Sequence, residues 1–123
     1  MPKTTVILYC EEDGACPFLE WLEDLPVKAQ DKCLVRVERL CELGHELRRP
    51  EADLLRDGIY ELRASLQGVN YRILYFFYGT VAAIVSHGIV KERAVPPKEI
   101  ERALERSKRF EMNPAKHRYG ETT

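Results

Sequence analysis

The order of apolar and polar residues divides the first part of the chain into a strand and two helical segments. Residues 6–10 form a short apolar run, VILYC, which predicts a first strand. Apolar residues recur at helical spacing over residues 18–25 and again over residues 27–43, so both segments are predicted to be helical. Pro26 interrupts the pattern between them, and Gly44 is a natural C-terminal cap. We therefore expect either a helical hairpin or one kinked helix.

After a polar connection at residues 46–51, the apolar positions change to a pattern typical of strands. A short strand is expected at residues 52–56, and the turn dipeptide Asp57-Gly58 ends it. Three further strands joined by short turns predict an antiparallel meander. These three strands are expected at residues 59–66, 71–78 and 81–89.

The C-terminal part reads as a helix followed by a polar tail. Over residues 98–110 the apolar side chains of Ile100, Ala103 and Leu104 fall on one helical face. Residues 113–123 are polar and are expected to be frayed. The fold class predicted is α+β, with a twisted antiparallel β-meander packed against the N-terminal helical hairpin and with a C-terminal helix. A chain of 123 residues fits one domain, and we expect residues 1–123 to form it.

Composition limits the class of protein. The hydrophobic content of 45% and charged content of 32% are those of a globular protein rather than a disordered one. No stretch approaches the roughly 20 apolar residues that a membrane-spanning helix needs. The N-terminus lacks a signal-peptide pattern, so we expect a cytoplasmic protein.

Charge is distributed unevenly along the chain. Residues 1–57 hold 8 Lys/Arg and 13 Asp/Glu, a balance of −5, whereas residues 58–110 hold 9 Lys/Arg and 5 Asp/Glu, a balance of +4. Such asymmetry is compatible with a surface that binds a polyanion on the second half of the protein. On charge alone, ordinary solvated faces are the better explanation of the pattern.

Cysteine spacing does not indicate a metal site. None of the four cysteines forms a CxxC pair, and His45 near Cys41 matches no zinc-binding spacing. We expect free thiols, no metal and no cofactor. The four are Cys10, Cys16, Cys33 and Cys41.

The first turn of the meander decides which side chains share a face, because successive residues of a strand point to opposite faces. If residues 67–70 form a four-residue loop, Leu66 pairs with Tyr71. Arg63 then lies opposite Leu74. A slip of one residue would move a whole strand's side chains to the other face, so this register is a hypothesis.

The second turn extends the same reasoning to the last strand. If Gly79-Thr80 is a two-residue loop, Tyr78 pairs with Val81, and Arg72 lies opposite His87. The opposite face is then apolar and suited to packing under helices. It carries Tyr60, Leu62, Leu66, Tyr71, Ile73, Tyr75 and Phe77, whereas the first face carries Arg63, Arg72, His87 and, if the strand continues, Lys91.

These residue types suit one kind of chemistry. Arginine binds phosphate bidentately, and a histidine or a lysine of lowered pKa can move a proton. Attack of an RNA 2′-OH on its own phosphate needs proton transfer and stabilisation of negative charge, and such a cluster supplies both without a metal. The alternative is that Arg63 pairs with Glu61 or another acid and only stabilises the sheet.

Several motifs then resemble the RelE/HigB superfamily of toxin–antitoxin toxins, most closely its phage-derived HigB-like branch. They are ELR at residues 61–63, YRILY at residues 71–75, HGIVKE at residues 87–92 and PPKEIERA at residues 96–103. The resemblance covers roughly residues 3–112. It implies an α+β fold and a ribosome-dependent mRNA endoribonuclease that uses the 2′-OH as nucleophile and leaves a cyclic phosphate. It also implies a cognate antitoxin, often a helix-turn-helix protein.

The resemblance assigns roles to individual residues. Arg72 matches a phosphate-contacting arginine, and Arg63 matches the basic position after EL. Lys91 and Arg93 fall in a basic segment that stabilises the transition state. Glu61 stands where better-known members carry a lysine, and no tyrosine follows on residues 98–109. The predicted catalytic residues are Arg72, Lys91, His87 and Arg93, and the predicted RNA- or phosphate-binding residues are Arg63, Arg72 and Lys91.

The sequence thus predicts a toxin of a type II toxin–antitoxin system that cleaves mRNA on the ribosome. Two alternatives stay open. One is a toxin-fold module that binds RNA or a protein without cleaving. The other is a transcriptional co-regulator that acts in complex with a DNA-binding antitoxin.

Overall fold

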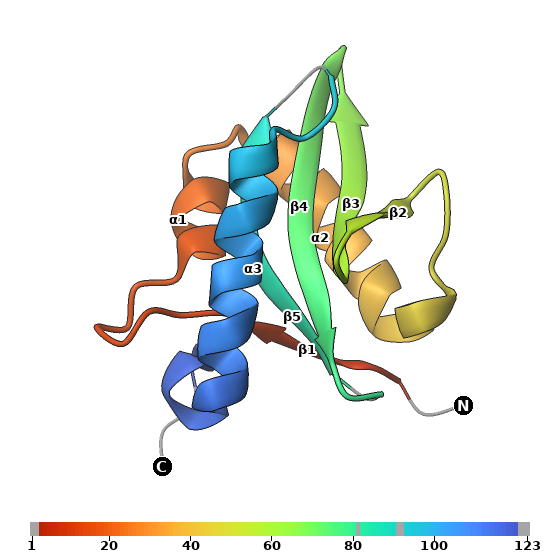
Figure 1. The fold of residues 1–123 in the computed structure, drawn as a ribbon. Coiled ribbons are helices and arrows are strands. Elements are labelled where there is room, and N and C mark those ends of the chain that lie inside the picture. Colours follow the sequence, from red (N-terminus) through yellow and green to blue (C-terminus); the bar gives the residue numbers. More distant parts are fainter. Residues whose placement is uncertain (1–2, 81, 91–92, 121–123) are drawn as a thin grey trace.

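A five-stranded mixed sheet forms the centre of the protein (Figure 1). The computed structural model describes residues 3–80, 82–90 and 93–120. Strand order across the sheet is β1-β5-β4-β3-β2. The strands are β1 (Thr5–Leu8), β2 (Ala52–Arg56), β3 (Ile59–Leu66), β4 (Val69–Tyr78) and β5 (Ala82–Val90).

The predicted α+β class and the antiparallel meander β3-β4-β5 are confirmed. Strand β2 adds a further antiparallel pairing to β3, whereas β1 pairs with β5 in parallel. Parallel neighbours need a long crossover, and here the chain between β1 and β5 supplies the helices α1 and α2 together with the other three strands.

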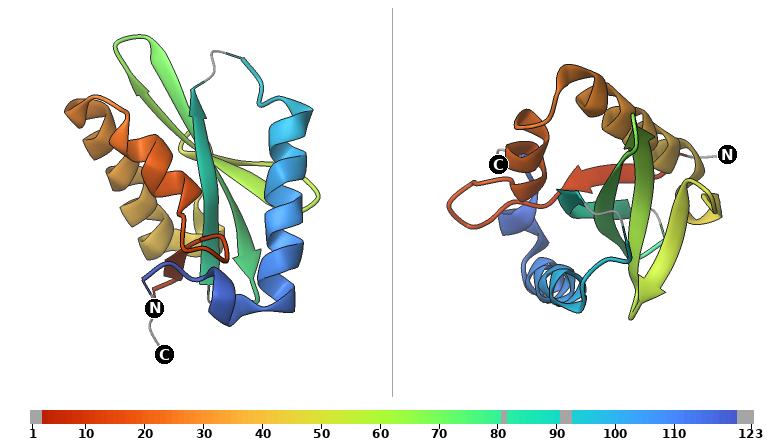
Figure 2. Two further views of the ribbon diagram at one scale, coloured as in Figure 1. Left: turned by 90° about the vertical axis from the view of Figure 1, so that its left-hand side faces the viewer. Right: turned by 90° about the horizontal axis from the view of Figure 1, so that it is seen from above.

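Helices cover both faces of the sheet. The right-hand view of Figure 2 shows α1 (Pro17–Glu23) and α2 (Val27–Leu43) on one side and α3 (Pro97–Met112) on the other. Short 3₁₀ helices, Gly44–Glu46 and Pro114–His117, follow α2 and α3. Across the residues that the structure describes, no helix has both the length and the apolar character needed to span a membrane.

Two apolar cores result from this layering. The core under α1 and α2 uses the sheet face predicted to pack under helices, including the buried Leu62, Ile73 and Tyr75. The second core lies between the sheet and α3, where Leu74 and Phe76 meet Ile100, Ala103 and Phe110. The sequence alternation therefore sorts the strand residues correctly onto two faces.

The turn between β3 and β4 is tighter than predicted. Leu66 pairs with Val69, so the four-residue loop expected at residues 67–70 is wrong. Gln67 and Gly68 both have positive φ, 52° and 82°, as a two-residue turn joining twisted strands requires. Consequently Arg63 lies opposite Arg72 rather than Leu74. The change is two residues in register, so the faces are unaffected.

The register between β4 and β5 also differs from the prediction. Tyr78 pairs with Ala82 rather than Val81, and Val81 itself lies outside the described residues. A bulge between Leu74 and Tyr75 then shifts the register by one further residue. Together the two shifts move the pairing by two residues, and an even shift leaves each side chain on the same face of the sheet. Arg72 therefore stays on the face of His87 but lies opposite Ile89.

The C-terminal segment predicted to be frayed is residues 113–123, but residues 117–119 are bonded to the body of the protein, and residues 121–123 lie outside the described residues. His117 is buried, its ring stacks on Tyr9 with 5.0 Å between centroids, and Nδ1 bonds the carbonyl of Cys10 at 2.8 Å. The Tyr119 amide donates to the Leu8 carbonyl at 2.9 Å. These contacts attach His117 and Tyr119 to β1 and to the segment after it. The polar character of this part of the sequence does not reveal the attachment.

Candidate functional site

A buried carboxylate organises the predicted basic face. Glu61 on β3 is 1% exposed. Its Oε1 accepts a hydrogen bond from Arg72 Nη1 at 2.7 Å, and its Oε2 accepts one from Arg63 Nε at 2.8 Å. A buried carboxylate is stable only when its charge is compensated, and here two guanidinium groups compensate it. The alternative that Arg63 pairs with Glu61 is therefore observed, but Arg72 joins the same pair.

The ion pairs continue from Arg63 towards the outer edge of the sheet. Arg63 Nη2 lies 3.2 Å from Asp53 Oδ2, which also accepts a 2.8 Å hydrogen bond from Arg49. That hydrogen bond from Arg49 is the largest influence lowering the pKa of Asp53. We call Arg49, Asp53, Glu61, Arg63 and Arg72 the arginine–carboxylate cluster. With three cations and two anions, it carries one net positive charge.

The cluster differs in exposure from one end to the other. The Arg49 side chain is 74% exposed, that of Arg63 36% and that of Arg72 16%. A guanidinium has five N–H donors, and Glu61 uses one of those on Arg72. Arg49 and Arg63 thus form the solvent-exposed end of the cluster, and Arg72 lies deeper beside Arg63.

The basic segment after β5 is described in part. Arg93 is exposed in a bend before α3, whereas Lys91 lies outside the described residues. Figures 1 and 2 show the described part of this connection, residues 93–96, at the same end of the molecule as the β3–β4 turn. Of the sequence-predicted residues, Arg63 and Arg72 lie directly opposite each other on β3 and β4, whereas Arg93 lies in the segment that leads into α3.

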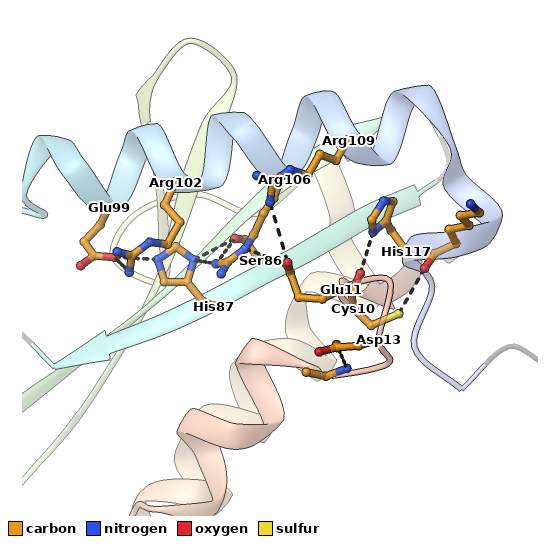
Figure 3. A network of polar contacts seen from close by, with 12 residues as sticks. Cys10, Glu11, Asp13, Ser86, His87, Glu99, Arg102, Arg106, Arg109 and His117 are labelled. Carbon is orange, nitrogen blue, oxygen red and sulfur yellow. Dashed lines mark hydrogen bonds and ion pairs between the residues drawn. The ribbon is translucent and has the colours of Figure 1, made fainter.

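His87 lies in a second polar network, between β5 and α3 (Figure 3). It is 5% exposed, and its Nε2 lies 3.0 Å from Glu99 Oε1. Its Nδ1 lies 3.0 Å from Arg106 Nη1 and 2.8 Å from Ser86 Oγ. A guanidinium only donates, so Nδ1 accepts and Nε2 carries the proton given to Glu99.

Burial and then the nearby Arg106 charge lower the pKa of His87 to about 4. The imidazole is therefore neutral near pH 7, and both ring nitrogens are engaged. Within the described residues, its polar partners come from α3 and from the adjacent Ser86. These contacts favour a role in holding α3 against the sheet over a role in proton transfer.

Arg106 extends this network to the N-terminal part of the chain, as Figure 3 shows. Its Nε lies 3.5 Å from Glu11 Oε1, and its guanidinium carbon lies 5.7 Å from the Tyr9 ring centroid. Burial lowers the pKa of Arg106, but the group remains charged at neutral pH. Sequence reasoning missed Arg106 and Glu99 because both fit an ordinary solvated helix face.

The structure also shows the state of the four cysteines and of possible metal ligands. All four cysteines are free thiols, and Cys10, Cys16 and Cys33 are buried. Burial raises the pKa of the Cys33 thiol to about 11. Across the described ranges, no group of three or more His, Cys, Asp or Glu side chains is arranged to hold a metal ion.

The chain matches the model of one protein family. A search of curated proteins finds no match. The family described as Phage derived protein Gp49-like (DUF891) matches residues 20–108, from α1 into α3. The match spans most of the chain and includes Glu61, Arg63, Arg72 and His87. The chain therefore belongs to the Phage derived protein Gp49-like family, a toxin-like family of the RelE/HigB type.

Proposed function

We propose that this protein is the toxin of a type II toxin–antitoxin system and that it cleaves mRNA on the ribosome. Membership in a toxin-like family supports a toxin. The observation that best supports RNA as the substrate is the direct pairing of Arg63 with Arg72 on one sheet face. Two adjacent guanidinium groups bind the non-bridging oxygens of a phosphate and stabilise the extra charge of its transition state.

The proposed reaction needs no external reagent other than the RNA. The 2′-oxygen attacks the neighbouring phosphorus and loses its proton, the P–O5′ bond breaks, and the departing 5′-oxygen gains a proton. A 2′,3′-cyclic phosphate remains. Arg63 and Arg72 hold the phosphate, whereas Lys91 and Arg93 belong to the segment to which the resemblance assigns transition-state stabilisation. Lys91 is the residue proposed to transfer the proton.

Glu61 favours a second candidate, in which the protein binds RNA without cutting it. Glu61 neutralises part of the positive charge of the two arginines, and His87 is neutral and bonded on both nitrogens. Such a site retains phosphate contacts but has weaker electrostatic stabilisation for the transition state. The partners in either case are ribosome-bound mRNA and a cognate antitoxin, proposed to be a helix-turn-helix protein in the same cytoplasm.

Induced expression followed by mapping of mRNA 5′ ends on translating ribosomes tests the proposal. Wild type should stop growth and give new ends within translated codons. Arg72→Ala should lose both effects, whereas Arg39→Ala, on α2 across the sheet, should keep them. Growth arrest without new mRNA ends would favour the non-cleaving candidate. Equal effects of wild type and Arg72→Ala would refute the assigned site.

A further inference from the structure

Strand β3 has a free outer edge beyond the point where β2 ends its pairing. Ala52 of β2 pairs with Leu62, and the Glu51 carbonyl accepts from the Arg63 amide at 2.8 Å. This last bond shows that the Arg63 backbone points away from β4. In an antiparallel ladder every second residue has this orientation, so the N–H and C=O of Ser65 also point outward. In the described chain no strand lies beside Ser65, which is exposed.

An arginine from α2 already occupies one acceptor on this edge. Arg36 Nε donates to the Arg63 carbonyl at 2.7 Å, which is the position that an N–H from a neighbouring strand would take. The protein therefore satisfies the edge as far as Arg63 with groups of its own. Ser65 is the next outward-facing residue and has two backbone groups available for an added strand.

A hollow of about 500 Å³ lies between α2 and this edge. Its apolar lining comes from Val35 on α2, which is 51% exposed, and from Ala64 and Leu66 on β3. Alternate side chains of a strand added at Ser65 would point towards α2 and enter the hollow. The open edge and the hollow thus belong to one surface.

Charge identifies the kind of strand that fits. The ionisable residues that line the hollow are the basic Lys28, Lys32 and Arg36 and one acid, Asp31. Lys28 and Lys32 are exposed, one helical turn apart, on the side of α2 that faces the hollow. Carboxylates are favoured here, and apolar side chains are favoured beside Val35 and Leu66.

We propose that this surface binds an extended acidic peptide segment of a partner protein, which adds as a strand beside Ser65 and directs acidic and apolar side chains towards α2. Main-chain hydrogen bonds at the edge supply affinity, and the side-chain hollow supplies selectivity. The surface adjoins Arg63 but uses the opposite face of the sheet from its guanidinium. The proposal does not depend on RNA cleavage.

Selection from a phage-displayed library of random dodecapeptides tests this surface. Purified full-length protein should enrich peptides in which acidic and apolar residues alternate. A synthetic copy of the most enriched peptide should then shift the amide resonances of Ser65 and Val35 in a ¹⁵N-labelled sample. The absence of an acidic, alternating consensus would overturn the proposal.

Charge-reversal variants locate the binding. The double variant Lys28→Glu/Lys32→Glu should bind the peptide at least about tenfold more weakly, since two attractive charges become repulsive. The matched control Lys98→Glu/Lys108→Glu, on exposed positions of α3, should bind as wild type does. Ser65→Pro, which removes the outward N–H at a position where an edge strand tolerates proline, should also weaken binding. Equal affinity of Lys28→Glu/Lys32→Glu and wild type would place the peptide elsewhere and overturn the proposal.

Discussion

Arg63 and Arg72 lie directly opposite each other across β3 and β4, and the carboxylate of Glu61 bonds both guanidinium groups. Like charges directly opposite in a ladder destabilise a sheet. Glu61 offsets that repulsion and fixes the orientation of both side chains. Glu61 stands where the resemblance to the RelE/HigB superfamily implies a lysine. Its contacts with Arg63 and Arg72 give this acid a structural role.

Replacement of Glu61 by glutamine should destabilise the fold. The amide keeps one acceptor but removes the buried charge that compensates two guanidinium groups. We expect a loss of about 2–4 kcal/mol in the free energy of unfolding, below the upper range for buried ion pairs because Arg63 is partly solvated. Urea denaturation measures it. Glu38→Gln, at an exposed position of α2, should change stability by less than about 0.5 kcal/mol, and an equal effect of the two variants would contradict the role of Glu61.

His87 should make stability fall in mild acid. Its pKa is about 4 in the folded protein and 6.5 in the unfolded chain, so the unfolded chain binds more protons between these values. Stability conferred by the neutral imidazole is complete above pH 6.5 and is lost as pH falls towards 4, by about 3 kcal/mol. The free energy of unfolding, measured by urea titration from pH 7.5 to 4, checks this dependence.

A variant isolates the histidine from the carboxylates that titrate in the same range. Glutamine at position 87 can accept from Arg106 and donate to Glu99 without titrating. His87→Gln should therefore flatten the difference between pH 7 and pH 4.5, whereas the control His45→Gln should retain the slope of wild type. A slope in His87→Gln as steep as that of wild type would assign the acid sensitivity to other groups.

Much of the fold could be predicted because its determinants are local. The helix at residues 27–43 and the strand at residues 59–66 follow from apolar spacing and from the flanking Pro26, Gly44 and Gly58. The parallel pairing of β1 with β5 could not, since nothing in a four-residue apolar strand specifies a partner so distant in the chain. The register shift between β4 and β5 at Leu74 and Tyr75 has no local signal either.

The site was predictable in its members but not in its contacts. Strand parity places Arg63, Arg72 and His87 on one face, and the two register errors happen to preserve that face. Parity carries no information on which side chains meet across the sheet or under a helix. It therefore could not show that Glu61 accepts hydrogen bonds from both arginines or that Arg106 donates to His87.

Gly88 and Trp21 should behave as a coupled pair. A Cβ at Gly88 would overlap the six-membered ring of Trp21, so Gly88→Ala should cost about 1–3 kcal/mol through overpacking. Trp21→Leu should reduce that cost, giving a non-additive double-mutant cycle in urea unfolding followed by circular dichroism. Because Trp21 is the single tryptophan, Gly88→Ala should also change the native fluorescence spectrum. Full additivity would show that the two residues do not contact.

The four thiols should differ in reactivity. Cys33 is fully buried with a thiol pKa raised to about 11, whereas Cys41 is partly exposed. The thiolate is the reactive form, so iodoacetamide at pH 8 should modify Cys41 first and Cys33 at the rate of unfolding. Peptide mass spectrometry over time measures the order. Cys41→Ser should remove the fast phase, and rapid modification of Cys33 in native protein would contradict its burial.

Loss of Arg72 or Arg63 should lower the salt dependence of RNA binding if each contacts a phosphate. For single-stranded RNA, each neutralised phosphate contributes about 0.7 to the slope of log affinity against log salt concentration. We expect Arg63→Ala and Arg72→Ala each to reduce the slope by about that amount, and Arg39→Ala to leave it unchanged. Fluorescence anisotropy with ribosomes programmed by 2′-O-methyl mRNA measures binding without cleavage, because the nucleophilic hydroxyl is blocked. Arg72 is more enclosed than Arg63. If the slope changes in Arg63→Ala but not in Arg72→Ala, RNA contacts only the exposed end of the arginine–carboxylate cluster. Arg72 would then serve to compensate the charge of Glu61.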